Sequence, residues 1–264
     1  NKNTVPGLPC EQTWTVLDGG DGNLYIGHVG SGFSILSLKD KSVKNFRNEA
    51  GNPMSLPGND VFCIIKDTNG NIWLGTNKGL ALYNAANENF ITFKKNKNDK
   101  YDTLCSRILS IRQLKDNKLW IASELNGIAI LNLKQSMFLS PEEISLEYIQ
   151  EGDDSRSLSN ASARCIFQDS FDNIWIGTWG GGINFISSKS PLFTTMSYSP
   201  IPNNENSLNN KVASSLCMDR QGRVWIGTDG GGINVFEGEK RTAIYKKESG
   251  DIPSNFLLAS LQDS

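Results

Sequence analysis

Short runs of apolar residues, separated by turn-forming residues, follow one another along the whole chain. One run covers residues 61–65, and a turn rich in Asp, Asn and Gly follows at residues 67–71. Two more apolar runs lie at residues 72–76 and 79–83, and a more polar run follows at residues 90–94. Asp, Asn and Gly tolerate the positive φ of tight hairpin turns. The pattern therefore predicts four short antiparallel strands in succession.

The same four-strand pattern occurs five times, and each copy carries an aromatic residue at the same place in its second strand. The segment around this ring reads Ile-Trp-Leu-Gly-Thr in the second copy and Val-Trp-Ile-Gly-Thr in the fifth. Successive rings are 48, 47, 55 and 50 residues apart. This period fits the four-stranded blade of a propeller and is too long for a leucine-rich or ankyrin repeat. The five rings are Tyr25, Trp73, Trp120, Trp175 and Trp225.

The predicted fold is all-β: a β-propeller of four-stranded blades, with strands A to D running from the innermost to the outermost position. The inner strands read as apolar because neighbouring blades cover both of their faces, whereas strand D is more polar because it forms the exposed edge. A large ring at one place in every blade fills the wedge between blades, so we expect a structural role for all five rings. The predicted blades cover residues 10–50, 58–97, 104–151, 160–200 and 210–249.

The start of a further blade is predicted at residues 254–264, because residues 255–264 match the strand A segment at 161–170. The first residues lack an initiator Met and an apolar signal core, as expected after removal of a signal or for an internal piece. A propeller closes its ring or protects its edges. We therefore expect residues 1–264 to be part of one longer propeller. A seven-bladed ring at this period needs roughly 340 residues.

The third repeat departs from the others. It has Ala122 and Ser123 where the second, fourth and fifth repeats have Gly and Thr. Its A–B turn is interpreted as shorter. Residues 135–157 are interpreted as an insertion or a lengthened outer hairpin, of the kind that can be functional.

Glycines and cysteines of the repeats have structural interpretations. Glycine triplets at residues 180–182 and 230–232 resemble phosphate-binding loops, which require a strand followed by a helix. Here they join two strands, so we interpret them as turns. Cys63 and Cys165 each lie ten residues before the repeated Trp, which predicts small buried core residues rather than reactive thiols. The odd total of five cysteines leaves open whether any of them is oxidised.

Composition argues against several function classes. The formal net charge is −2, so no general attraction to nucleic acid is expected. No apolar stretch approaches the roughly 18 residues of a membrane span, so no direct membrane insertion is expected. His28 is the single histidine, and no two cysteines form a Cys-x-x-Cys pair, which argues against a zinc site. No catalytic residue, metal or cofactor is predicted, although 28 acidic residues leave a carboxylate pair open.

The loops that join strand B to C and strand D to A are expected on one face of the propeller. The B–C tips vary in sequence while their flanks stay similar, which is typical of a repeat binding surface. Trp179 is the predicted anchor, because the fifth repeat has Asp229 at the same place between the same flanks. Sugars stack their CH faces on aromatic rings and pair their hydroxyls with planar polar groups. The candidate ligand-binding residues are Trp179, Glu124, Asn126, Asp229, Lys78 and His28.

Each candidate also has a simpler interpretation as a solvated loop residue. Trp179 is compatible with packing onto a neighbouring loop. His28 is compatible with a polar strand end, since Thr76, Thr178 and Thr228 occupy the equivalent places.

Residues 169–186 and 219–236 resemble the two-component regulator propeller repeat most closely. Both contain an Asp, a short turn, an aliphatic residue, Trp-Ile-Gly-Thr, and glycines followed by a hydrophobic residue. The resemblance covers nearly the whole chain. It implies the periplasmic sensor region of a Bacteroides-type hybrid two-component system histidine kinase, whose parent protein is anchored in the inner membrane and drives a phosphorelay.

The resemblance further implies an oligosaccharide ligand. The implied partners are a second propeller and the other domains of the parent chain, and a homodimer is compatible with it. No kinase motif lies in residues 1–264. Three functions stay open: a glycan-sensing receptor module, a scaffold for protein–protein interaction, and a propeller lyase or glycoside hydrolase.

Overall fold

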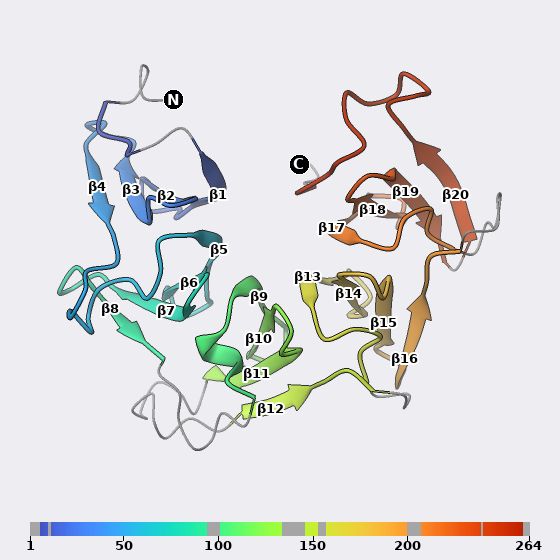
Figure 1. Cartoon of the computed structure of the whole chain (residues 1–264), viewed down its shortest axis with the longest axis horizontal. Helices are drawn as coiled ribbons and strands as arrows, with labels where there is room; N and C mark the ends of the chain where they lie inside the picture. Colours follow the sequence, from blue (N-terminus) through green and yellow to red (C-terminus); the bar gives the residue numbers. More distant parts are fainter. Residues whose placement is uncertain are drawn as a thin grey trace. The chain divides into compact units, whose positions relative to one another are not determined.

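The computed structural model describes residues 6–9, 12–93, 101–133, 146–152, 157–199, 207–238 and 240–260. These residues form five four-stranded sheets, each a meander of antiparallel strands (Figure 1). The predicted fold class, an all-β propeller of four-stranded blades, is confirmed. The chain divides into two compact units, Asn1–Glu147 and Tyr148–Ser264, which we call the N-terminal and the C-terminal unit. None of the helical segments in the described ranges has the length and apolar character needed to cross a membrane.

The N-terminal unit holds the first two sheets and all of the third except the end of its last strand. The first consists of β1 (Thr13–Asp18), β2 (Asn23–His28), β3 (Phe33–Ser37) and β4 (Val43–Phe46). The second consists of β5 (Val61–Lys66), β6 (Ile72–Thr76), β7 (Gly79–Asn84) and β8 (Asn89–Thr92). The short helix η1 (Thr103–Cys105) precedes the third sheet, which consists of β9 (Ile108–Gln113), β10 (Lys118–Ser123), β11 (Ile128–Asn132) and β12 (Leu146–Ile149).

The C-terminal unit holds the fourth and fifth sheets. The fourth consists of β13 (Ala163–Gln168), β14 (Ile174–Thr178), β15 (Ile183–Ser187) and β16 (Ser190–Met196). The fifth consists of β17 (Ala213–Met218), β18 (Val224–Thr228), β19 (Gly232–Glu237) and β20 (Lys240–Tyr245). Most of the predicted insertion at 135–157, and the last residues of the predicted further blade, 261–264, lie outside the described residues.

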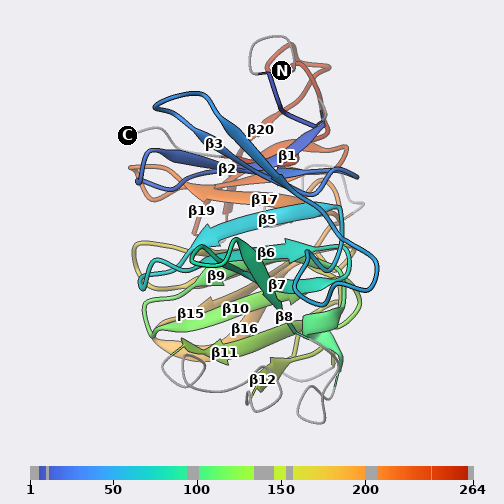
Figure 2. The same ribbon diagram turned by 90° about the vertical axis from the view of Figure 1, so that its left-hand side faces the viewer.

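Neighbouring sheets within a unit stack face to face, and the apolar runs fill the space between them. Figure 2 shows the first sheet stacked on the second, where Tyr25 and Phe33 pack in one core with Leu74, Tyr83 and Phe90. Burying a large apolar side chain stabilises the fold by about 1.5–3 kcal/mol, so the sheets depend on their neighbours for stability. The corresponding core of the C-terminal unit contains Trp175, Ile183, Leu216, Val224, Ile226 and Phe236.

An Asp at the end of strand A organises the A–B turn in three repeats. The backbone N–H groups of Asn69 and Asn71 donate to Asp67 Oδ1, both at 2.9 Å. The indole N–H of Trp73 donates to Asp67 Oδ2 at 2.9 Å. One carboxylate therefore caps the turn and satisfies the polar edge of the buried ring. The same indole bond recurs between Trp175 and Asp169 at 3.0 Å and between Trp225 and Asp219 at 2.8 Å.

The third repeat lacks this arrangement because Leu114 stands in place of the Asp. Trp120 is buried, and its indole N–H has no hydrogen-bond partner among the described residues. The A–B turn is not shortened, contrary to the sequence interpretation. The N–H of Leu114 donates to the carbonyl of Lys118 at 3.0 Å, which is the hydrogen bond that closes the turn in the other repeats. The sequence looked different because Asn117, at φ 62°, occupies the place of the turn glycine.

Glycine in strand B allows two strand A segments to approach closely. A Cβ at Gly177 would lie 2.6 Å from Cys165 Sγ and 3.0 Å from the carbonyl oxygen of Ala213, on the next sheet. A Cβ at Gly75 would lie 2.5 Å from Cys63 Sγ. Both cysteines are half-buried, and burial raises the pKa of Cys63 to about 12 and that of Cys165 to about 11. At neutral pH both side chains are therefore thiols that pack against glycine.

The segment after β20 lies against the fifth sheet. The N–H of Leu257 donates to the carbonyl of Thr228 at 3.1 Å, and the N–H of Gly230 donates to that of Asn255 at 3.0 Å. The segment before β17 lies against the fourth sheet in the same way. Val212 forms an isolated bridge with Trp179, and the carbonyl of Lys211 accepts the N–H of Gly180. A cavity of about 420 Å³ lies beside the segment after β20, and its lining includes Cys217 and Trp225.

Candidate functional site

The B–C and D–A loops lie at the same end of each sheet, as the strand topology predicts. At one B–C tip, the N–H of Trp179 donates to the carbonyl of Ser162, just before strand A of the same sheet, at 2.9 Å. The next residue, Gly180, donates to the carbonyl of Lys211, before strand A of the following sheet, at 3.1 Å. These bonds give the varied tips a constant backbone. The bond that Trp179 makes recurs in the other four sheets, where the N–H of the first tip residue donates to the carbonyl of the residue before strand A. The pairs are Val29 to Gln12, Asn77 to Asp60, Glu124 to Arg107 and Asp229 to Val212.

Four side chains of the N-terminal unit contact one another in a row at this end. We call Trp14, Phe62, Arg107 and Glu124 the loop-end row. The rings of Trp14 and Phe62 meet edge to face, with centroids 5.6 Å apart. The guanidinium of Arg107 lies 4.8 Å from the centre of the Phe62 ring, and its Nη1 is 3.2 Å from Glu124 Oε2. Trp14 is 44% exposed, so the row has an accessible ring at one end and an accessible ion pair at the other, with Phe62 between them.

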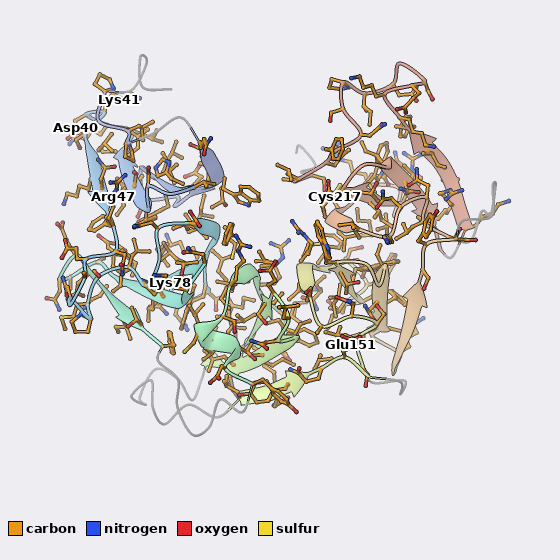
Figure 3. The ribbon with its side chains drawn as sticks, viewed as in Figure 1. Asp40, Lys41, Arg47, Lys78, Glu151 and Cys217 are labelled. Atoms are coloured by element: carbon orange, nitrogen blue, oxygen red, sulfur yellow. The ribbon has the colours of Figure 1, made fainter. Side chains whose placement is uncertain are left out.

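Two other predicted residues of the N-terminal unit, Asn126 and Lys78, differ in whether their side chains are available to a ligand. The side-chain amide of Asn126 donates to Ser106 Oγ, and the backbone carbonyl of Asn126 accepts a hydrogen bond from Thr103 Oγ1 at 3.3 Å. Asn126 therefore fixes the loop before β9. Lys78 is exposed at the tip between β6 and β7 (Figure 3). Glu124 and Lys78 are thus the accessible members of the predicted set in this unit.

His28 lies inside the first sheet. It is fully buried, and its Nε2 is 2.8 Å from Ser34 Oγ. Burial lowers the pKa of His28, and the charge of Arg47 lowers it further. A side chain without exposed surface is not available at the loop tips, which argues against the predicted ligand contact of His28. The polar strand end accounts for its position, because Thr76, Ser123, Thr178 and Thr228 are likewise fully buried.

Trp179 is an accessible ring at the loop end of the C-terminal unit. It is 46% exposed, and the guanidinium carbon of Arg164 lies 4.6 Å from its ring centre. Arg164 belongs to β13 of the same sheet, so the ring contacts its own sheet and keeps nearly half of its surface open. The other predicted residue, Asp229, is half-buried at the tip of the fifth sheet and forms an isolated bridge with Phe256.

Sequence reasoning missed Trp14, Phe62 and Arg164. These residues occupy the same place, the second residue of strand A, in the first, second and fourth repeats. The equivalent residues of the third and fifth repeats are Leu109 and Ser214. This position therefore varies as strongly as the B–C tips, and an alignment of the repeats on strand A exposes the signal.

The loop end offers binding chemistry rather than an evident catalytic group. Trp179 has a guanidinium against its ring, and Trp14 contacts the Phe62 ring on which the Arg107–Glu124 pair is held. Both arrangements suit a ligand with CH faces and hydroxyl groups. No group of three or more His, Cys, Asp or Glu side chains in the described ranges could hold a metal ion.

Family comparison gives the repeats a name. Residues 55–78, 157–180 and 207–230 match the family described as Two component regulator propeller. Each match runs from the D–A loop through strands A and B to the B–C tip, and together they include Phe62, Arg164 and Trp179. Three segments of the chain therefore match two-component regulator propeller repeats, in agreement with the resemblance.

Solved structures share the fold. A crystal structure described as the extracellular domain of the hybrid two component system BT3049 from B. thetaiotaomicron is 59% identical over 100% of this chain, with a TM-score of 0.59. A second, described as the extracellular domain of the hybrid two component system BT4673 from the same organism, has a TM-score of 0.75 over 93% of this chain at 17% identity. The chain spans 31% and 33% of these two structures.

A curated relative extends the same similarity. Histidine kinase P4 from Formosa agariphila is 33% identical over 94 residues, which cover 34% of this chain and 7% of the relative. The chain is thus similar to a small part of a much longer protein.

Proposed function

We propose that this chain, which carries two-component regulator propeller repeats, is a periplasmic ligand-sensing module of a hybrid two-component receptor, and that its ligand is an oligosaccharide. The module binds ligand at the loop end of its sheets. The parent protein couples this binding to a histidine kinase and a phosphorelay. The second propeller and the remaining domains of the parent chain are the proposed partners, and a homodimer is compatible with this arrangement.

The sensor role rests on one observation. The whole chain is 59% identical to a segment of a protein described as the extracellular domain of a hybrid two component system. An identity of 59% over 100% of this chain makes a shared role of the module the simplest account.

The ligand class rests on the side chains at the loop end. Trp14 and Trp179 are nearly half exposed, although apolar surface in water is unfavourable by about 25 cal/mol per Å². Arg107, Glu124 and Arg164 lie beside or near these rings. A pyranose has a face of CH groups that stacks on an indole and hydroxyls that pair with planar polar groups.

The test is a binding screen of the chain against oligosaccharides by isothermal titration calorimetry. Trp14→Ala and Trp179→Ala should each be made, and at least one should weaken binding tenfold or more, or about 1.4 kcal/mol. Phe171→Ala is the matched control. Phe171 is 68% exposed but lies on the A–B turn at the other end of the fourth sheet, so its removal should leave the affinity unchanged.

Two outcomes would contradict this proposal. Failure of every oligosaccharide to bind would remove the ligand class. Release of cleaved product during the titration would favour a lyase or a glycoside hydrolase over a receptor module.

A further inference from the structure

Two arginines at the loop end stack on aromatic rings but differ in their charge partners. Arg107 lies over Phe62 and forms an ion pair with Glu124 at 3.2 Å. Arg164 lies over Trp179 at 4.6 Å, and no carboxylate in the described part of the chain pairs with it. Arg164 as a residue is half-buried, and its charge has no counter-charge among the described residues.

Two acidic residues of the described chain, Glu151 and Asp229, lie near this tip, and neither forms an ion pair with Arg164. Glu151 Oε2 accepts the backbone N–H of Ala161 at 2.9 Å. Asp229 belongs to the tip of the next sheet, where its N–H donates to the carbonyl of Val212 at 3.1 Å. Lys211 adds a second exposed cation to the D–A loop that binds Gly180. Arg164 and Lys211 thus place two cations at the Trp179 tip, and within the described residues Arg164 has no carboxylate partner.

We infer that the ligand bound at this tip is an anionic oligosaccharide, whose uronic-acid carboxylate or sulfate pairs with Arg164 while a sugar ring covers the exposed part of Trp179. This inference rests on the proposed function and narrows its ligand class. The planar guanidinium fork matches a carboxylate or a sulfate with two parallel hydrogen bonds. The partly buried position makes such a pair stronger than a fully solvated one, because water screens it less.

Arg164 is positioned by stacking on the Trp179 ring and not by an ion pair with a carboxylate of the described chain. An indole face fixes the guanidinium through a cation–π contact but leaves its N–H donors available in the ring plane. Glu124 uses part of the donor set of Arg107 in the N-terminal unit. Arg164 is thus preorganised for an external anion, whereas Arg107 already has an internal one.

The experiment compares three probes on the whole chain by calorimetry: a uronic-acid trisaccharide, a sulfated disaccharide, and neutral oligosaccharides of matching length. An anionic probe should bind at least tenfold more tightly than its neutral counterpart, and the difference should shrink at high ionic strength. The carboxylated and the sulfated probe together identify which anion the tip prefers.

Arg164→Gln removes the charge and keeps part of the side chain. It should weaken the anionic probe at least tenfold and the neutral one less than twofold. Arg164→Lys keeps the charge but loses the planar fork, so its effect on the anionic probe should be intermediate. Lys189→Gln, on the exposed turn between β15 and β16 at the other end of the sheet, removes the same charge and should change neither affinity. Circular dichroism melting of each variant verifies that the fold is retained.

The outcomes separate the inference from the function on which it rests. Equal affinity for anionic and neutral probes, or an Arg164→Gln variant that binds the anionic probe as well as the parent chain does, overturns the inference and leaves an oligosaccharide receptor in place. Absence of binding to all of the probes overturns the proposed function and the inference together.

Discussion

The imidazole of His28 is enclosed by the first sheet, where it contacts Ser34 Oγ at 2.8 Å. Its Nδ1 has no hydrogen-bond partner among the described residues. Burial disfavours the charged imidazolium and, with the nearby charge of Arg47, moves the pKa of His28 below its ordinary value of 6.5. Folding therefore excludes a proton that the unfolded chain binds readily.

This exclusion makes the stability of the chain depend on pH. Between pH 6.5 and the lower pKa of the folded state, the unfolded chain carries the proton and the folded chain does not. The stability that the neutral form of His28 contributes is therefore fully present above this window, and the free energy of unfolding falls as the pH decreases through it. Thr fills the equivalent position in three repeats, so His28→Thr should give a flatter pH dependence. Urea denaturation of both chains from about pH 7 to about pH 5 measures the difference, and identical slopes would contradict the assignment.

The sequence predicted part of the candidate site. The remaining residues could not be assigned, because the sequence does not show whether a side chain near a strand end is exposed at the loops or buried in the core. Trp179 and Glu124 were found because the B–C tips vary between repeats, and both are accessible. His28 was misplaced because a residue at the very end of strand B looks like a tip residue in sequence, while its side chain points into the core. Trp14 and Arg164 were missed because strand A was read as apolar core throughout, although its first residues reach the loop end.

The A–B hairpin with its Asp and Trp is an element in which one hydrogen bond can be isolated. Trp73 donates to Asp67, whereas the equally buried Trp120 has no partner for its indole N–H in the described chain. Trp73→Phe should therefore lower the free energy of unfolding by about 1–3 kcal/mol more than Trp120→Phe does. The two substitutions remove the same atoms, so the loss of apolar area largely cancels. Urea denaturation of the two variants gives the difference.

A further variant verifies that the carboxylate is the cause. Asp67→Asn keeps the size of the side chain but removes the charge that strengthens the indole bond. In the Asp67→Asn background, Trp73→Phe should cost less than in the parent chain. Equal costs of Trp73→Phe and Trp120→Phe in the parent chain would show that the bond contributes nothing to stability.

At the scale of the strands, hydrophobic pattern and turn chemistry were sufficient for most of the fold. The second strand of each repeat lies where the ring predicted it, since Trp73 falls in β6 and Trp175 in β14. The A–B turn of the third repeat was misjudged, because the backbone accepts Asn117 at positive φ as well as glycine. Turn length follows from backbone hydrogen bonds, and residue type indicates these only indirectly.

At the scale of the whole unit, stability passes from one sheet to the next through the stacked faces within that unit, as in other repeat architectures. The segment that contains Leu257 lies on the fifth sheet, and Leu257 lines the cavity beside Trp225. Leu257→Ala should enlarge this cavity and lower the local opening free energy of β17–β20 by about 1–2 kcal/mol. Hydrogen exchange followed by mass spectrometry should show faster exchange in these strands and unchanged exchange in β1–β8.

Leu258→Ala is the matched control for this effect. Leu258 is the next residue in the chain, but it is 62% exposed, so its truncation should leave exchange in the fifth sheet unchanged. Equal acceleration by both variants would show that the segment acts through its backbone and not through the Leu257 side chain.

The unequal exposure of the indoles has an optical consequence. Trp14 and Trp179 are nearly half exposed, while Trp73, Trp120 and Trp175 are buried. Trp225 is half-buried, and its indole N–H donates to Asp219. Indoles in contact with water emit at longer wavelength than enclosed ones, so the red edge of the fluorescence spectrum comes mainly from Trp14 and Trp179. One of them lies in each unit, and replacing either leaves the signal of the other. Difference spectra between the parent chain and the Trp14→Ala and Trp179→Ala variants therefore report on the loop end of each unit in turn, without any added dye.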